Sequence, residues 1–155
     1  AFEPGKRAFN CLCANLLLKD LSARVTPCST GLSDMNGKRR FYLRGGSGAA
    51  DGCTLRHADD AQRQQDLCEV RTLDSYHFRN VGFVRIDVDG HELPILQGSV
   101  RTLQACGHPP VMITSPPDGP DAGEQRRDLV AFLTSLGYEI HPIRGWSDQV
   151  LGVKA

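Results

Sequence analysis

Hydrophobic positions near the N-terminus recur with the period of a helix. The apolar side chains with this spacing are Phe9, Leu12, Cys13 and Leu16. They would lie on one helical face, and Pro4 and Gly5 supply a turn before them. The pattern predicts an amphipathic helix over about residues 6–18, preceded by the stub of a strand at residues 1–3.

The middle of the chain carries its strongest strand signal. Residues 81–88 are an almost unbroken run of β-forming residues, which is typical of a strand covered on both faces in a parallel sheet. Asp89 and Gly90 end the run, and apolar side chains then follow one helical face from Leu93 to Leu103. This order predicts a central strand, a turn and one helix.

The C-terminal third alternates between strand and helix patterns. Residues 110–114 form a short apolar run, and the apolar positions within 129–136 have helical spacing that stops at Gly137. Residues 138–143 alternate like a half-buried strand, with residues 150–153 as the antiparallel partner. Strands that alternate with helices predict an open α/β sheet.

The region between these parts has weaker signals. Short strands are expected within residues 24–32 and at 41–43. The glycine-rich stretch 45–52 lacks the Gly-Lys-Ser/Thr of a phosphate-binding loop, and mixed charges follow it. Residues 44–66 are therefore expected to be a flexible loop without chemistry.

Composition narrows the function classes. The length of 155 residues suits a single domain. The 18 basic residues balance the 18 acidic ones, so the protein has no net positive charge that would attract nucleic acid or an anionic membrane. No apolar run approaches the ~20 residues of a membrane span. Six cysteines without a Cys-x-x-Cys pair suggest reduced, partly buried thiols. We expect a cytoplasmic protein that binds neither nucleic acid nor a membrane.

Polar residues follow several predicted strands. In an open α/β sheet the ligand crevice lies beyond the carboxyl ends of the strands. The residues at those ends are Glu3, Ser33, Asp34 and the segment 87–92. A carboxylate such as Glu3 can hold both hydroxyls of a ribose, although an acid so close to the end of the chain can also be an ordinary surface residue.

Three potential metal ligands lie close together in the chain: Asp87, Asp89 and His91. A calcium loop is excluded, because Arg85 and Leu96 would stand where that loop needs carboxylates. A transition-metal site stays open, and with it a metal-dependent hydrolase. His91 and Glu92 could instead stabilise the start of the following helix.

Several motifs occur in an order that is familiar as a set. They are Phe2-Glu3-Pro4, Gly31-Leu32-Ser33-Asp34, Thr72-Leu73-Asp74, and the block from Ile86-Asp87-Val88-Asp89-Gly90-His91-Glu92 to Leu96-Gln97-Gly98. Together they resemble the FkbM family of S-adenosylmethionine-dependent methyltransferases. The resemblance covers about residues 1–145, and the block at 84–98 is its most specific part.

The resemblance implies a Rossmann-like class I methyltransferase fold. Its sheet would be mostly parallel with an antiparallel C-terminal strand, and it would lack its first strand, glycine-rich turn and first helix. That first strand lies in the middle of the family's sheet, so its absence would leave unpaired edges in the core. The chain also departs from the family where Asp89 replaces a Glu and where Ser-Pro-Pro at 115–117 replaces a common Glu.

The resemblance also implies roles for the polar residues. S-adenosylmethionine would be the cofactor, with Glu3 on its ribose, Ser33 or Asp34 near its adenine, and Asp87 near its methionine part. The acceptor would be a hydroxyl of a sugar or small natural product, and no metal would be needed. The first candidate for the base is His91, with Asp89 and Glu92 next. A non-catalytic interaction module that retains the α/β frame is the alternative.

Overall fold

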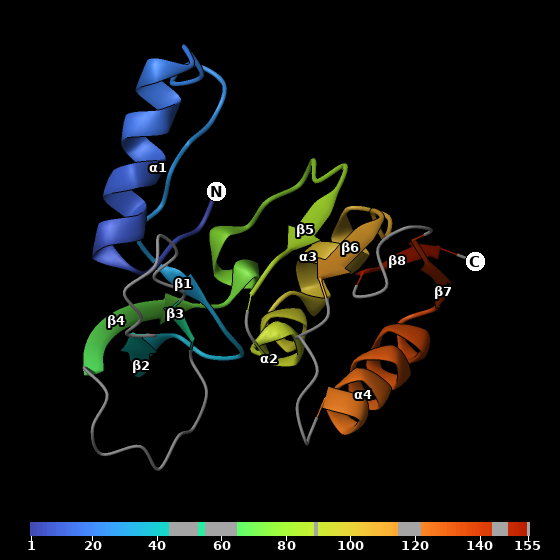
Figure 1. Cartoon of the computed structure of the whole chain (residues 1–155). Coiled ribbons are helices and arrows are strands. Elements are labelled where there is room, and N and C mark those ends of the chain that lie inside the picture. Colours follow the sequence, from blue (N-terminus) through green and yellow to red (C-terminus); the bar gives the residue numbers. More distant parts are fainter. Residues whose placement is uncertain (44–52, 55–64, 89, 115–121, 144–148, 155) are drawn as a thin grey trace.

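The structure of the chain, a computed structural model, describes residues 1–43, 53–54, 65–88, 90–114, 122–143 and 149–154 (Figure 1). Its first helix, α1 (Lys6–Leu18), follows Gly5 and confirms the predicted helix. Leu16 is the buried residue of α1. In Figure 1 the helix projects from the rest of the molecule, beside the segment that leads back to the first sheet. No helix in the described part of the chain is long and apolar enough to cross a membrane.

The first sheet is formed largely by polar strands. Its order is β1 (Gly31–Leu32), β4 (Gln65–Arg71), β2 (Gly37–Leu43) and β3 (Cys53–Thr54). The long antiparallel pairing of β2 with β4 extends from Gly37↔Val70 to Tyr42↔Gln65. Both β3 and the start of β4 fall inside the predicted loop 44–66, so that prediction is wrong there. In β4 the buried Cys68 and Val70 alternate with the exposed Leu67 and Glu69, but this pattern is too short to stand out in the sequence.

The second sheet is more apolar. Its order is β5 (Val84–Ile86), β6 (Val111–Thr114), β8 (Gln149–Lys154) and β7 (Tyr138–Pro142). Strand β5 is parallel to β6, and β8 is antiparallel to both of its neighbours. This confirms the expected antiparallel C-terminal strand. Helix α4 (Ala122–Ser135) leads into β7 through Gly137, whose φ of +84° favours glycine.

The main hydrophobic core lies between the second sheet and its helices. Side chains with no exposed surface come from both layers: Leu96, Leu103, Val111, Ile113 and Leu133. Helices α2 and α4 contact each other, and α4 also contacts β7. The sequence places apolar residues on one face of each of these elements, and removal of these faces from water packs the elements against each other.

Two predictions for the middle of the chain need correction. The expected strand 81–88 is reduced to β5, which lies at the edge of the described sheet instead of inside it. The expected single helix is divided into α2 (Glu92–Gln97) and α3 (Val100–Ala105). At the break, the carbonyl of Gly98 accepts from the backbone N–H of Asp74 at 3.0 Å. The side chain of Asp74 then accepts the N–H of Thr102 at 2.7 Å, the donor that a continuous helix would pair with Gly98.

The mostly parallel sheet is also not what the described residues form. The parallel pairs are β1–β4, β5–β6 and a single bridge between Phe2 and Cys28, whereas the pairings of β2 with β3 and β4 and of β8 with β6 and β7 are antiparallel. The chain reverses direction at Asn36-Gly37, so β2 runs antiparallel to its neighbour β4. The single-domain organisation stays a prediction.

Candidate functional site

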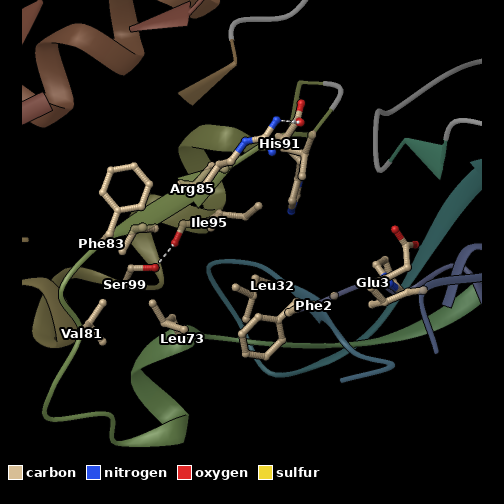
Figure 2. Close-up of a pocket in the computed structure, with 18 of the residues that line it drawn as sticks. Phe2, Glu3, Leu32, Leu73, Val81, Phe83, Arg85, His91, Ile95 and Ser99 are labelled. Atoms are coloured by element: carbon tan, nitrogen blue, oxygen red, sulfur yellow. Dashed lines mark hydrogen bonds and ion pairs between the residues drawn. The ribbon is translucent and has the colours of Figure 1, made fainter. Parts of the chain in front are cut away.

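A groove of about 840 Å³ lies between the N-terminal segment and the β5 edge of the second sheet (Figure 2). Phe2 and Glu3 line one side, and residues of β5 line the other. Leu32, Leu73 and Ile95 add apolar surface between them. Grooves with mostly apolar walls and a few polar groups are the usual form of a small-molecule site.

Three of the predicted site residues line this groove although they are far apart in the chain: Glu3, Asp87 and His91. Glu3 follows the Phe2–Cys28 bridge, Asp87 follows β5, and His91 is the N-cap residue of α2. The structure therefore gathers these residues at the ends of strands, where the sequence analysis expected a ligand crevice.

Glu3 is half-buried at the start of α1. Its Oε1 accepts a hydrogen bond from the backbone N–H of Gly5 at 2.7 Å. The backbone N–H of Glu3 donates to the carbonyl of Cys28 at 3.0 Å. Both contacts fix the residue at the side of the groove, and a carboxylate has further lone pairs with which to accept hydroxyl donors.

Arg85 is a groove residue that the sequence analysis did not select. It lies on β5, and its guanidinium pairs with the carboxylate of Asp87. Both side chains are about half exposed, at 54% and 53%. Arg85 is the one basic residue inside the apolar run 81–88, and this was the signal that could have identified it.

Ser33, Asp34 and His91 are connected by hydrogen bonds. The fully buried Ser33 hydroxyl donates to Asp34 Oδ1 at 2.8 Å and lies 3.1 Å from His91 Nε2. Asp34 Oδ1 also accepts from Arg39 at 2.9 Å. Because the Ser33 hydroxyl is engaged inside the protein, Asp34 is the more accessible of the two predicted adenine ligands.

Glu92 lies apart from the groove. The side chain is 4% exposed, and its Oε1 accepts the backbone N–H of Gly90 at 3.1 Å. It faces a smaller pocket between α2 and α4. Asp89 lies outside the described residues, as do residues 115–117. Of the predicted base candidates that the structure describes, His91 lines the groove and Glu92 does not.

The part of the chain that the structure describes contains no group of three His, Cys, Asp or Glu side chains that could hold a metal ion. Asp89 falls outside this part, so the hypothesis of a site made by Asp87, Asp89 and His91 stays untested. Within the described residues no disulfide joins Cys11, Cys13, Cys28, Cys68 and Cys106, of which Cys68 is buried and Cys11 exposed.

Aromatic side chains continue from the groove along the surface. The rings of Phe2 and Tyr76 meet edge to face with centroids 5.1 Å apart. Tyr76 then stacks on Phe78 at 5.7 Å. Phe83, also at the groove, is 53% exposed. These rings extend the apolar surface of the groove.

Comparisons with known proteins point to one family. A family profile described as the methyltransferase FkbM domain matches residues 1–140. The fold is similar to the crystal structure of methyltransferase FkbM from Methylobacillus flagellatus KT, with a TM-score of 0.62 and 16% sequence identity. The match covers 98% of this chain and 35% of that chain, so the present chain spans about a third of its length. The comparison with curated protein sequences gave no match.

Proposed function

Because the chain belongs to the FkbM methyltransferase family, we propose that it takes part in methyl transfer from S-adenosylmethionine to a hydroxyl oxygen of a sugar or small natural product. The family match bears out the resemblance found in the motifs and supports methyl transfer as the reaction. The observation that carries the proposal is the single groove lined by Glu3, Asp87 and His91. The family resemblance implies a role for each of these residues toward the same cofactor and acceptor, and these roles require the three side chains to lie around one site.

The groove is suited to a nucleoside cofactor in size and chemistry. Its volume of about 840 Å³ lies within the range of about 300–1,000 Å³ that is common for ligand pockets. Glu3 would hold the ribose hydroxyls and Asp87 would lie near the methionine part. By resemblance, Ser33 or Asp34 would lie near the adenine, although neither is among the residues that line the groove.

In this proposal the protein mainly positions two reactants. The bound cofactor supplies a methyl group on a positively charged sulfur. Holding the acceptor oxygen in line with that group converts a bimolecular step into an effectively unimolecular one. His91, at the groove, would take the proton of the acceptor hydroxyl. Asp89 remains the next candidate, whereas the buried contact of Glu92 with Gly90 suits it less.

Calorimetric titration of S-adenosylhomocysteine tests the cofactor role. We expect the 155-residue chain to bind it and Glu3→Gln to bind at least about tenfold more weakly, since a hydrogen bond to a charged group contributes about 1.5–3 kcal/mol. Gln still offers an oxygen to the N–H of Gly5, so α1 should begin as before. Glu139→Ala, an exposed change on β7, is the matched control and should bind like the wild type.

Two results would contradict the proposal. Equal binding by Glu3→Gln and the wild type would remove Glu3 from the ribose site. An absence of binding by a wild-type chain with a folded circular dichroism spectrum would show that these residues alone do not hold the cofactor.

A further inference from the structure

We propose that Ser33 and Asp34 are positioning residues that hold His91 with its ring proton on Nε2, so that Nδ1 is its basic nitrogen. This inference rests on the proposed function, in which His91 takes a proton from the acceptor. It adds the nitrogen that does so, and it assigns Ser33 and Asp34 a task other than cofactor binding.

The direction of the hydrogen bonds follows from counting protons. A serine hydroxyl has one proton, and the Ser33 hydroxyl gives it to Asp34 Oδ1 at 2.8 Å. An ionised carboxylate only accepts hydrogen bonds, so this bond cannot run the other way. The 3.1 Å contact between Ser33 Oγ and His91 Nε2 must then be donated by the histidine. A neutral imidazole with its proton on Nε2 has its lone pair on Nδ1.

Ser33 is held firmly enough to impose this order. It has no exposed surface, and its backbone N–H donates to the carbonyl of Arg71 at 3.0 Å. Its own carbonyl lies against Gly98, where a Cβ atom would come within 2.0 Å of the oxygen. The hydroxyl is therefore presented to the His91 ring from a fixed backbone.

The chain of bonds begins at the groove and ends at the surface. His91 lines the groove and is 5% exposed, whereas Ser33 and Asp34 do not line it. Asp34 is anchored at its outer end by the guanidinium of Arg39 at 2.9 Å. The partners of Nε2 thus extend from the ring toward the surface, and hydrogen bonds of this kind fix the orientation and tautomer of a histidine ring.

Nitrogen-15 NMR of the histidine side chains tests this directly. In the 155-residue chain with ¹⁵N-labelled histidine, two-bond proton–nitrogen correlations identify the protonated nitrogen of each ring. His91→Gln assigns its signal among the five histidines. We expect neutral His91 to carry its proton on Nε2. In Asp34→Ala the Ser33 hydroxyl is released to donate to Nε2, so the Nδ1–H form should become populated.

Matched variants separate positioning from general effects. Asp34 is exposed, so Asp34→Ala should fold, and Ser33→Ala should likewise abolish the preference for Nε2–H. Glu69→Ala removes a comparable surface ion pair, with Arg71, and should leave the His91 signals unchanged. A wild-type His91 protonated on Nδ1 would overturn the inference, as would an Nε2–H preference that survives both Ser33→Ala and Asp34→Ala.

The same samples distinguish this inference from the proposed function. An Nε2–H preference that depends on Ser33 and Asp34, without S-adenosylhomocysteine binding, would support the hydrogen-bond chain and contradict the cofactor role of this chain. Binding without that preference would contradict the hydrogen-bond chain alone.

Discussion

Three acidic side chains in the motifs of this protein accept hydrogen bonds from backbone N–H groups. Glu3 accepts from Gly5, Glu92 accepts from Gly90, and Asp74 accepts from two amides at the start of α3. Such contacts stabilise helix starts, where several N–H groups lack partners within the helix. No side-chain hydrogen bond caps α2, so the helix-start alternative for Glu92 rests on its place in the first turn of that helix.

A buried tyrosine makes stability depend on alkaline pH. Burial raises the pKa of Tyr138 from 10.0 to about 12, while its hydroxyl donates to the carbonyl of Pro109 at 3.0 Å. Between these two pH values the unfolded chain ionises first, so the free energy of unfolding should fall as pH rises from 10 to 12. Tyr138→Phe should cost about 1 kcal/mol at pH 7 and show a smaller loss across that window. Urea unfolding of both proteins at several pH values checks this, and equal losses would contradict it.

Among the elements, the turn between α2 and α3 packs closely against the end of β1 in the first sheet. The turn between these helices places Gly98 against the backbone of Ser33, immediately after β1. Asp74 joins the same turn through its backbone N–H and its side chain. Three motifs that are separate in the sequence thus meet at one packing point, which gives the glycine of the Leu-Gln-Gly step a structural task.

Gly98→Ala should therefore destabilise the fold. The new Cβ would lie 2.0 Å from the Ser33 carbonyl oxygen, and the clash involves backbone atoms that cannot rotate away. We expect a loss of about 1–3 kcal/mol in the free energy of unfolding, measured by urea denaturation. Gly82→Ala is the control, because a Cβ there meets nothing within 4 Å and the change should stay within about 0.5 kcal/mol. Similar effects of the two substitutions would refute the packing argument.

At the scale of the whole molecule, burial is distributed unevenly. Strand β6 lies between β5 and β8, and its residues Val111 and Ile113 have no exposed surface. By contrast, α1 buries Leu16 and exposes Leu17 and Leu18 at 74% and 80%. Few buried apolar contacts allow a segment to open without global unfolding.

Hydrogen exchange followed by mass spectrometry should show this difference. We expect peptides from α1 to exchange at least about tenfold faster than peptides from β6, because the β6 amides open only with the core. Helical peptides from α4, which buries Leu129 and Leu133, provide the comparison for helix geometry itself. Protection of α1 equal to that of β6 would contradict the expectation.

Local sequence patterns were sufficient to identify the elements with strong apolar periodicity and the family. The helix at 6–18, the strand before Thr114, the helix that ends before Gly137 and the antiparallel C-terminal pair all occur as predicted. Each is specified by its own residues, since apolar side chains at a regular period must face one core. The motif order likewise indicated methyl transfer before any contact was known.

The contacts between distant segments could be found only in the tertiary structure. Strands β2 and β4 pair through backbone hydrogen bonds, and the helix break at Gly98 depends on Asp74, 24 positions earlier. The contact between Ser33 and His91 joins positions 58 residues apart. The local pattern of apolar residues indicates which side chains a segment buries. The features above depend instead on which distant segment packs against it. The groove and its hydrogen-bond chain therefore had to be found in the folded protein.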